Sequence, residues 1–336
     1  MTLGVLALFV LMAYGQEKKF ALYSVAFYNM ENLFDTIHDE GKNDYEYLPN
    51  GTNQWNTMKY KAKLKNMSEI LSLLSTDKLP MGPAIIGVSE IENYRVLEDI
   101  LKQPALADRG YQYVHYEGAD QRGVDCAFFY NPKLFELTNS KLVPYVYIND
   151  TVHKTRGFLI ASGNIAGEKM HFIVNHWPSR AAASPARERA GEQVRAIKDS
   201  LLREDSAAKI VIMGDMNDDP MDKSMAVALG AKRKPADVGP TDLYNPWWDT
   251  LKKGYGTLMY KGKWNLFDQI VFTGNLLGTD RSTLKFYKHE IFRRDFMFQK
   301  EGKYKGYPKR TQAGGVWLNG YSDHLPTIIY LIKEVK

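Results

Sequence analysis

The chain of 336 residues has a single cysteine, Cys126. One cysteine excludes an intrachain disulfide and any zinc site built from several thiolates. Cys126 lies in the strand-like run Val-Asp-Cys-Ala-Phe-Phe, which favours a buried and inert thiol. Hydrophobic residues make up 44% of the chain and charged residues 25%, so a sizeable core can be buried at this length without a covalent cross-link.

Long hydrophobic runs are also lacking. Residues 1–15 are apolar and uncharged, but this stretch is too short to span a membrane. With Ala13-Tyr14-Gly15 before Gln16, it resembles the core and cleavage region of a signal peptide, and the missing basic region indicates a truncated or misassigned start. A first buried strand is the competing interpretation. We expect an exported protein, periplasmic or extracellular, without a transmembrane segment, and no cysteine follows the run to carry a lipid anchor.

Internal repeats, low-complexity tracts and a clear interdomain linker are absent from the sequence. Strand-like runs alternate with amphipathic helical patterns, and hairpins and crossovers are both present, which is typical of one α/β domain with mixed sheets. We expect this single domain to cover residues 20–335 and to be monomeric. The expected strands are 20–29, 84–89, 111–116, 124–130, 158–162, 170–175, 209–213, 267–273 and 325–332, and the expected helices are 55–75, 96–102 and one that begins at Ser184-Pro185.

Basic charge is concentrated in one part of the chain. Residues 281–310 contain ten Lys or Arg and three Asp or Glu, a net +7, so the remainder carries −2 of the total +5. A basic segment on a nearly neutral body favours an anionic partner such as a phosphate-bearing substrate, and a solvated loop is the alternative. We expect part of this segment to border the substrate groove.

The most informative stretch is Lys209-Ile-Val-Ile-Met-Gly-Asp-Met-Asn-Asp218. A continuous apolar run that ends at Gly214 is typical of a buried strand. Asp215 and Asn217 follow two positions apart, so their side chains point the same way if the extended geometry persists. Because ligands bind outside the carboxyl ends of strands in open α/β sheets, this pair could orient a water molecule and an anion.

Other strand-like runs also begin or end with polar residues of catalytic type: Asn29, Glu31, Glu90, His176, Asp268, Asp323 and His324. Any one of them could be a satisfied polar group, but so many in one chain indicate a site. Carboxylate and amide oxygens are hard ligands that suit Mg²⁺, Mn²⁺ or Ca²⁺ rather than Zn²⁺. Two histidines beside such a metal suit proton transfer and stabilisation of a pentavalent phosphorus centre, and metal-assisted attack by water is the recurrent route for phosphate ester hydrolysis.

These residues also form a known pattern. Asn29-Met-Glu31, Val88-Ser-Glu90, Gly214-Asp-Met-Asn217, Asp268-Gln-Ile-Val and Ser322-Asp-His-Leu-Pro326 resemble, in order and context, the endonuclease/exonuclease/phosphatase superfamily. The resemblance spans residues 21–332. That superfamily includes pancreatic-type deoxyribonucleases, abasic-site endonucleases, sphingomyelinases and inositol-polyphosphate 5-phosphatases. The resemblance implies a four-layer α/β sandwich, with two mixed sheets face to face and helices outside.

The resemblance also implies the metal site. Glu90 resembles the principal ligand of a divalent cation, with Asn29, Glu31 and Asp323 near the ion. The implied ion is Mg²⁺, with Mn²⁺ or Ca²⁺ as alternatives.

The remaining roles are implied in the same way. Asp215 resembles the residue that orients or deprotonates the attacking water, and Asn217 resembles one that holds the phosphate. His324 resembles the phosphate-binding or general-base histidine, oriented by Asp268. His176 stands where the deoxyribonuclease and sphingomyelinase branches have a histidine and the abasic-endonuclease branch a tyrosine, which argues against abasic-site repair.

Arg180, shortly after His176, could give a bidentate phosphate contact, or it could be a solvated loop residue. Arg122 and Asp125 leave the same choice open. The leading hypothesis is a secreted, divalent-metal-dependent phosphodiesterase, most simply a nuclease that cuts internal phosphodiester bonds by in-line attack of water. The alternatives are a phosphomonoesterase or a sphingomyelinase-type lipid phosphodiesterase on the same site, and a binding module that has kept the fold without the chemistry.

Overall fold

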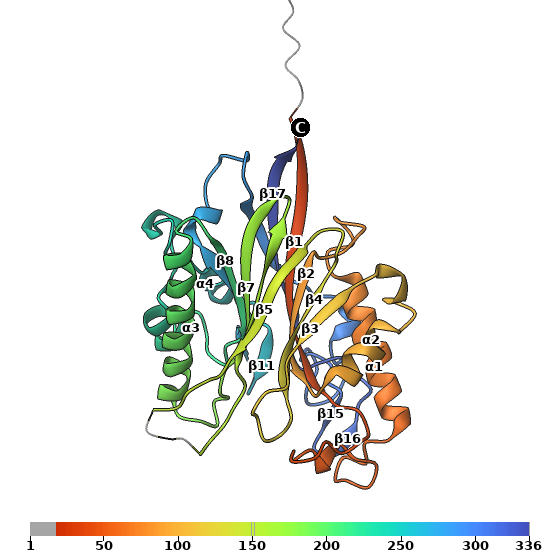
Figure 1. The fold of residues 1–336 in the computed structure, drawn as a ribbon. Helices are drawn as coiled ribbons and strands as arrows, with labels where there is room; N and C mark the ends of the chain where they lie inside the picture. Colours follow the sequence, from red (N-terminus) through yellow and green to blue (C-terminus); the bar gives the residue numbers. More distant parts are fainter. Residues whose placement is uncertain (1–17, 149, 151, 336) are drawn as a thin grey trace, which may run out of the picture.

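The computed structural model describes residues 18–148, 150 and 152–335, so the signal-peptide interpretation of residues 1–15 lies outside the described part. Two large mixed sheets pack face to face, with helices on both outer sides (Figure 1). The predicted four-layer α/β sandwich is therefore confirmed. Within the described ranges, none of the helices combines the length and apolar character needed to cross a membrane.

The first sheet has six strands and contains both ends of the described chain. β1 pairs antiparallel with β17 and parallel with β2. In spatial order its strands are β14 (Lys285–Ile291), β17 (Thr327–Val335), β1 (Lys19–Leu33), β2 (Ile85–Ile91), β4 (Asp125–Tyr130) and β3 (Gln112–His115).

The second sheet has seven strands, with β7 and β8 parallel and β8 and β13 antiparallel at its centre. In spatial order they are β5 (Glu136–Val143), β6 (Phe158–Ile165), β7 (Glu168–His176), β8 (Lys209–Asp215), β13 (Asp268–Thr273), β10 (Leu243–Tyr244) and β9 (Ala231–Lys232).

The helices and two small hairpins complete the structure. The helices are α1 (Thr57–Leu73), α2 (Tyr94–Leu101), α3 (Ser184–Glu204) and the short α4 (Trp248–Lys252). The hairpins are β11 (Leu258–Tyr260) with β12 (Lys263–Asn265), and β15 (Gln312–Ala313) with β16 (Val316–Trp317). The labelled hairpin strands β11, β15 and β16 lie toward the end of the sandwich opposite the C-terminal end of β17 (Figure 1).

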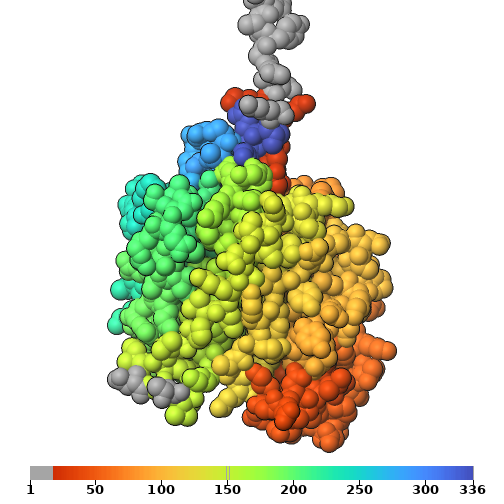
Figure 2. All heavy atoms as spheres, in the orientation of Figure 1, coloured from red at the N-terminus to blue at the C-terminus, as the bar shows by residue number. Residues whose placement is uncertain are grey.

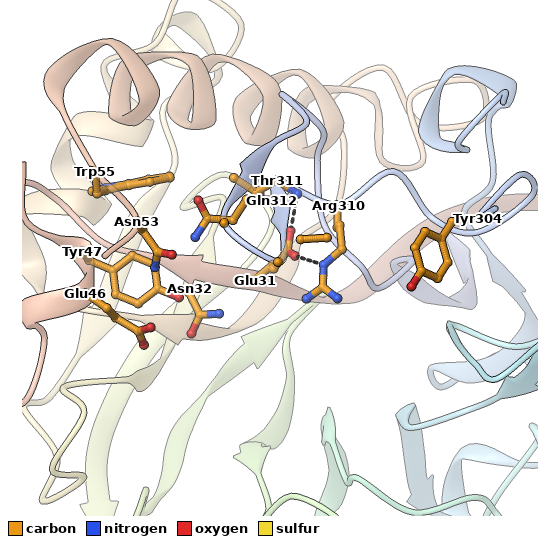
Figure 3. A pocket seen from close by; sticks show the side chains of 13 residues that line it. Glu31, Asn32, Glu46, Tyr47, Asn53, Trp55, Tyr304, Arg310, Thr311 and Gln312 are labelled. Carbon is orange, nitrogen blue, oxygen red and sulfur yellow. Dashed lines mark hydrogen bonds and ion pairs between the residues drawn. The ribbon is translucent and has the colours of Figure 1, made fainter. Parts of the chain in front are cut away.

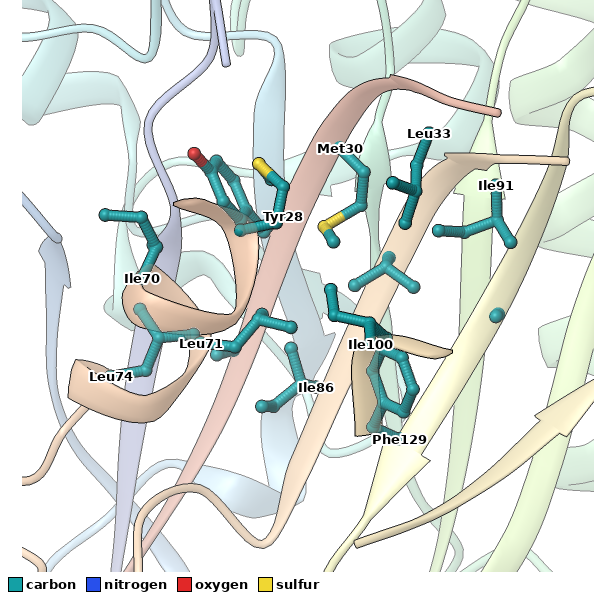
Figure 4. Packing of buried hydrophobic residues seen from close by; sticks show 14 of the residues in the cluster. Tyr28, Met30, Leu33, Ile70, Leu71, Leu74, Ile86, Ile91, Ile100 and Phe129 are labelled. Carbon is teal, nitrogen blue, oxygen red and sulfur yellow. The ribbon is translucent and has the colours of Figure 1, made fainter. Parts of the chain in front are cut away.

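Three layers of buried apolar side chains hold the sandwich together. One lies between the first sheet and helices α1 and α2, where Ile70, Leu71 and Leu74 of α1 approach Tyr28 of β1 (Figure 4). A second lies between the two sheets, and a third lies under α3. Side chains close the face of the molecule over β3 and β5, without an opening between the sheets in that view (Figure 2).

Most predicted elements are present, but two strands of the large sheets were not predicted. β5 and β14 each lie at the edge of a sheet, and most of their side chains are half-buried or exposed. β14 carries Lys285 and Lys288 within the segment that we had described only as basic. Lysines are common on edge strands because they discourage pairing with another chain. The same charges conceal the alternation that identifies a strand in sequence.

The strand register positions the polar residues. Asp215 lies opposite His176 of the neighbouring parallel strand and opposite Asp268 of the neighbouring antiparallel strand. These three residues therefore lie side by side on β7, β8 and β13, at one end of the second sheet. Asn29 and Glu90 lie at the corresponding ends of β1 and β2 in the first sheet.

The closeness of the two sheets makes Gly87 a sensitive position. A Cβ atom there would lie 2.6 Å from Sδ of Met213 and 3.2 Å from Cγ1 of Val174, both on the facing sheet. We predict that Gly87→Val lowers the free energy of unfolding by about 1–3 kcal/mol, the usual cost of overpacking. Urea denaturation followed by circular dichroism measures this, and unchanged stability would show that the two sheets are less tightly packed than described.

Candidate active site

The site begins with a contact between the two sheets. The side-chain amide of Asn29 on β1 donates to Oε1 of Glu90 at 3.2 Å and to Oδ2 of Asp215 at 3.0 Å. Its oxygen accepts the backbone N–H of Glu31 at 2.8 Å. Asn29 and Asp215 are buried, whereas Glu90 is partly exposed. One amide thus holds two carboxylates from different sheets beside each other.

Irregular backbone aims the site residues. The pairing of β1 with β2 shifts register between Asn29 and Leu33, and that of β2 with β4 shifts between Ser89 and Ile91. Within these irregularities Glu31 has φ +45° and Glu90 has φ +60°, and Asn217 just after β8 has φ +51°. Such angles cost of order 1–3 kcal/mol in residues other than glycine, and they concentrate at functional sites. The structure maintains this strain where the polar residues converge.

A cleft of about 370 Å³ opens over these residues. Its volume suits a phosphate group with part of a substrate. The lining side chains come from both sheets and their connecting loops, and they are Glu90, Arg122, Arg156, His176, Ser179, Asp215, Asn217 and His324.

His324 and Asp268 form a buried pair at one side of the cleft. Nδ1 of His324 lies 2.7 Å from Oδ2 of Asp268, and its Nε2 lies 3.8 Å from Oδ2 of Asp215. Burial lowers the pKa of His324, but the charges of Asp268 and Asp215 outweigh burial and raise this pKa well above its usual value. The ring is therefore held as an imidazolium with Nε2 directed toward Asp215.

His176 has the opposite electrostatic character. Burial, followed by the charges of Arg156 and Arg122, lowers its pKa well below the usual value. Its Nε2 lies 3.7 Å from Oε1 of Glu90 and 3.8 Å from Oδ2 of Asp215. The site therefore contains one neutral and one protonated imidazole, a division that suits acid and base roles in one reaction.

Asp215 lies between the two histidines. Burial and the charges of Asp268 and Glu90 raise its pKa to about 7, although the charge of His324 opposes the shift. Its Oδ1 accepts the backbone N–H of Asn217 at 2.9 Å, and the side chain of Asn217 donates to the backbone oxygen of Trp177 at 3.1 Å. The carboxylate is thus fixed in orientation but poorly compensated in charge.

The donor chemistry fits a divalent cation. Glu90, His176 and Asp215 each offer a ligand atom, and these atoms lie within 4.8 Å of one another. Asp215, Asp268 and His324 form a second such group. Carboxylate oxygens of this kind suit Mg²⁺, Mn²⁺ or Ca²⁺. A cation would also compensate the negative charge that raises the pKa of Asp215.

The predicted ligands Glu31 and Asp323 are both bound to Arg310. Nε of Arg310 donates to Oε1 of Glu31 at 2.8 Å, and its Nη2 lies 2.9 Å from Oδ2 of Asp323. The backbone N–H of Thr311 donates to the other oxygen of Glu31 at 2.6 Å (Figure 3). The fully buried Lys63 of α1 lies 3.8 Å from Glu31. Glu31 therefore anchors the chain around Thr311 in this arrangement.

Arg180, predicted to contact substrate, is engaged by carboxylates. It lies 3.3 Å from Asp218, 3.3 Å from Asp219 and 2.8 Å from Asp222, and its guanidinium lies over Phe267. Its Nε also donates to the backbone oxygen of Asn217. These contacts brace the loop after β8.

Two other arginines line the cleft instead. Arg156 is buried, contacts Asp120 at 3.1 Å and donates to the backbone oxygen of Trp177 at 2.8 Å, while its Nε has no partner among the described residues. Arg122 is half exposed, as one of the two interpretations of its motif allowed. Sequence analysis did not identify Arg156, because it precedes a strand without any motif of its own. Cys126 is buried, as predicted.

Comparisons with solved structures give the same fold at low identity. An endonuclease/exonuclease/phosphatase family protein from Bacteroides thetaiotaomicron is 15% identical with a TM-score of 0.58, over 95% of this chain and 98% of the other. A mannosyl-6-phosphatase from the same organism is 14% identical with a TM-score of 0.56, over 92% and 99%. TDP2 from D. rerio, complexed with a single-strand DNA product, is 14% identical with a TM-score of 0.53, over 93% and 99%.

These likenesses show the fold alone, and no curated protein matches the chain. The family model is more decisive. The model described as Endonuclease/Exonuclease/phosphatase family matches residues 24–333, nearly the whole described chain. It covers all the motifs on which the resemblance was based. The chain therefore belongs to the endonuclease/exonuclease/phosphatase family.

Proposed function

We propose that this protein is a divalent-metal-dependent hydrolase of phosphate esters that acts by in-line attack of water. The observation that carries the proposal is the convergence of Glu90, Asp215 and Asp268 with two histidines of opposite protonation at the ends of both sheets. Few other reactions need carboxylates, a cation and an imidazolium around one small anion. The family and its neighbours, which include a phosphatase, support this reaction class.

The metal site is proposed around Glu90, the carboxylate that is exposed to the cleft. The bound ion would act as a Lewis acid on a phosphate oxygen. Ligation by Asn29 would require its amide to turn, since its oxygen accepts the N–H of Glu31. Ligation by Glu31 or Asp323 would require Arg310 to give up at least one contact. Their roles as ligands remain predictions.

The remaining roles follow from position and charge. Asp215 orients and deprotonates the attacking water, since a carboxylate with a pKa of about 7 is a base matched to neutral pH. The imidazolium of His324, held by Asp268, stabilises charge on the phosphate. Neutral His176 shares the bound oxygens from the opposite side, and Asn217 holds the phosphate. Arg180 remains a predicted substrate contact, although its present contacts favour support of the Asn217 loop.

A phosphodiester, most simply in a nucleic acid, is the leading substrate. The second candidate is a phosphomonoester. It is favoured by Arg122 and Arg156, because two guanidiniums at one cleft suit a dianionic terminal phosphate. The mannosyl-6-phosphatase neighbour agrees with that candidate. Export, a monomeric state and a single domain over residues 20–335 remain predictions from the sequence.

The first prediction concerns the metal. Chelation should abolish hydrolysis of a chromogenic phosphodiester, and Mg²⁺ or Mn²⁺ should restore it. Glu90→Gln removes a charge with little change in volume, so it should raise the Mg²⁺ concentration needed for half-maximal rate by at least about tenfold. Exposed Glu40→Gln is the matched control. Full activity after exhaustive chelation would refute the proposal.

The second prediction concerns the histidines. His176→Ala and His324→Ala should each lower kcat on the order of 10²–10⁴-fold, the range for loss of a general acid or base. The control is the exposed His153→Ala, which should retain the wild-type rate. If both site variants behave like the control, the two rings have only a structural role.

The third prediction concerns the protonation of His324. Asp268→Asn keeps the shape but removes the charge that stabilises the imidazolium, so the pKa of His324 should fall. Histidine NMR of the full chain in chelator measures it. In the wild type the pair adds stability that is fully present below pH 6.5 and is lost as the pH rises through the raised pKa; the variant should lack this dependence.

The matched control is Asp150→Asn, which alters an exposed histidine pair instead. An unshifted His324 in Asp268→Asn would mean that Asp268 does not set its protonation.

A further inference from the structure

Beside the catalytic cleft lies a larger hollow of about 950 Å³, which we call the tyrosine groove. It runs between the β11–β12 hairpin, residues 299–308 and the β15–β16 hairpin. Its lining includes Leu258, Tyr260, Tyr304, Tyr307, Leu318 and Asp323. The volume lies at the upper end of the range of small-molecule sites, roughly 300–1,000 Å³. The reaction proposed above does not by itself explain a hollow of this size.

The groove is joined directly to the catalytic residues. Leu258 forms an antiparallel bridge with His324, and the backbone N–H of Leu325 donates to the oxygen of Thr257 at 2.9 Å. The backbone N–H of Asp268 lies 3.3 Å from Oγ1 of Thr257. Asp323 lines the groove itself. A molecule in the groove would therefore end next to the imidazole of His324.

The groove has rigid walls that present aromatic rings. The turn of the β11–β12 hairpin is fastened to the opposite loop, because Gly262 donates its N–H to the hydroxyl of Tyr307 at 2.6 Å. Tyr260 is 62% exposed and Tyr304 is 51% exposed, so both rings have a face free for a ligand. Tyr304 also lines the neighbouring pocket with Arg310 (Figure 3), so it borders two hollows.

Positive charge follows the rings. The Lys261 ammonium lies 5.2 Å from the ring centre of Tyr260, and that of Lys303 lies 5.5 Å from the ring centre of Tyr304. Lys303 and Arg310 show that part of the basic segment lines the groove. Other members of the segment do not serve it: Arg293 lies over Trp264 and Phe298.

We propose that the tyrosine groove binds an unpaired nucleic-acid strand, with bases stacked on Tyr260 and Tyr304 and phosphates near Lys261 and Lys303. Exposed aromatic rings alternating with cations are the usual means of binding single strands. A duplex keeps its bases stacked inside and cannot offer them to these rings. A small sugar phosphate has its only phosphate at the catalytic centre and would leave both lysines unused. The inference rests on the proposed function, since the strand leads to its cleft.

Fluorescence anisotropy of a labelled twelve-nucleotide thymidine strand, with the same strand in a duplex as comparison, tests the proposal on the full chain in Ca²⁺. The single strand should bind more tightly than the duplex. Tyr260→Ala with Tyr304→Ala should raise Kd on the order of tenfold or more, through the loss of one or two stacked bases. The double Tyr→Phe variant should retain wild-type affinity, because it keeps the rings. Lys261→Gln with Lys303→Gln should reduce the salt slope by about two.

Tyr287→Ala is the control, since Tyr287 is 52% exposed and lies on β14 outside the groove. In turnover, the ratio of kcat/KM on the strand to that on a small chromogenic diester should fall in the alanine variant. Unchanged Kd in that variant, equal binding of the duplex, or an equal fall on both substrates would overturn the inference. Binding only to phosphatidylglycerol vesicles would also overturn it. If wild type binds the strand but hydrolyses no phosphoester, the proposed function fails and the groove inference stands.

Discussion

The structure depends on negative charge held in a nearly water-free place. Three carboxylates, Glu90, Asp215 and Asp268, converge where the two sheets meet, and two of them are buried. Like charges this close raise one another's pKa and oppose folding. The raised pKa of Asp215, about 7, is the measure of that conflict. The surrounding structure has to compensate it.

The compensation explains much of the local architecture. Asn29 donates to two of the carboxylates, and His324 takes a proton because Asp268 and Asp215 face it. The irregular backbone at Glu31 and Glu90 turns side chains toward partners that a regular strand would not reach. Arg310 and Lys63 balance the neighbouring acids. A divalent cation would complete the set, which is why the same arrangement serves both folding and chemistry.

The sequence was sufficient for the fold and for the residues at strand ends, because apolar runs bounded by turns identify buried strands. It did not predict the edge strands β5 and β14, whose polar residues conceal their alternation. It placed Arg180 beside the phosphate, but neighbouring acids satisfy that side chain. It missed Arg156, because side chains that reach a cleft from outside any motif depend on packing. The link between Glu31 and Asp323 through Arg310 joins residues far apart in sequence, and no local pattern reveals it.

The central claim is that this acidic centre is built to bind one divalent cation. Calorimetric titration of Mg²⁺ into the chelator-stripped full chain at pH 7, repeated in two buffers of different ionisation enthalpy, tests it most directly. The account predicts one saturable site and release of protons, because a carboxyl with a pKa of about 7 must lose its proton as the ion binds. Absence of saturable binding, or binding without proton release, would contradict it.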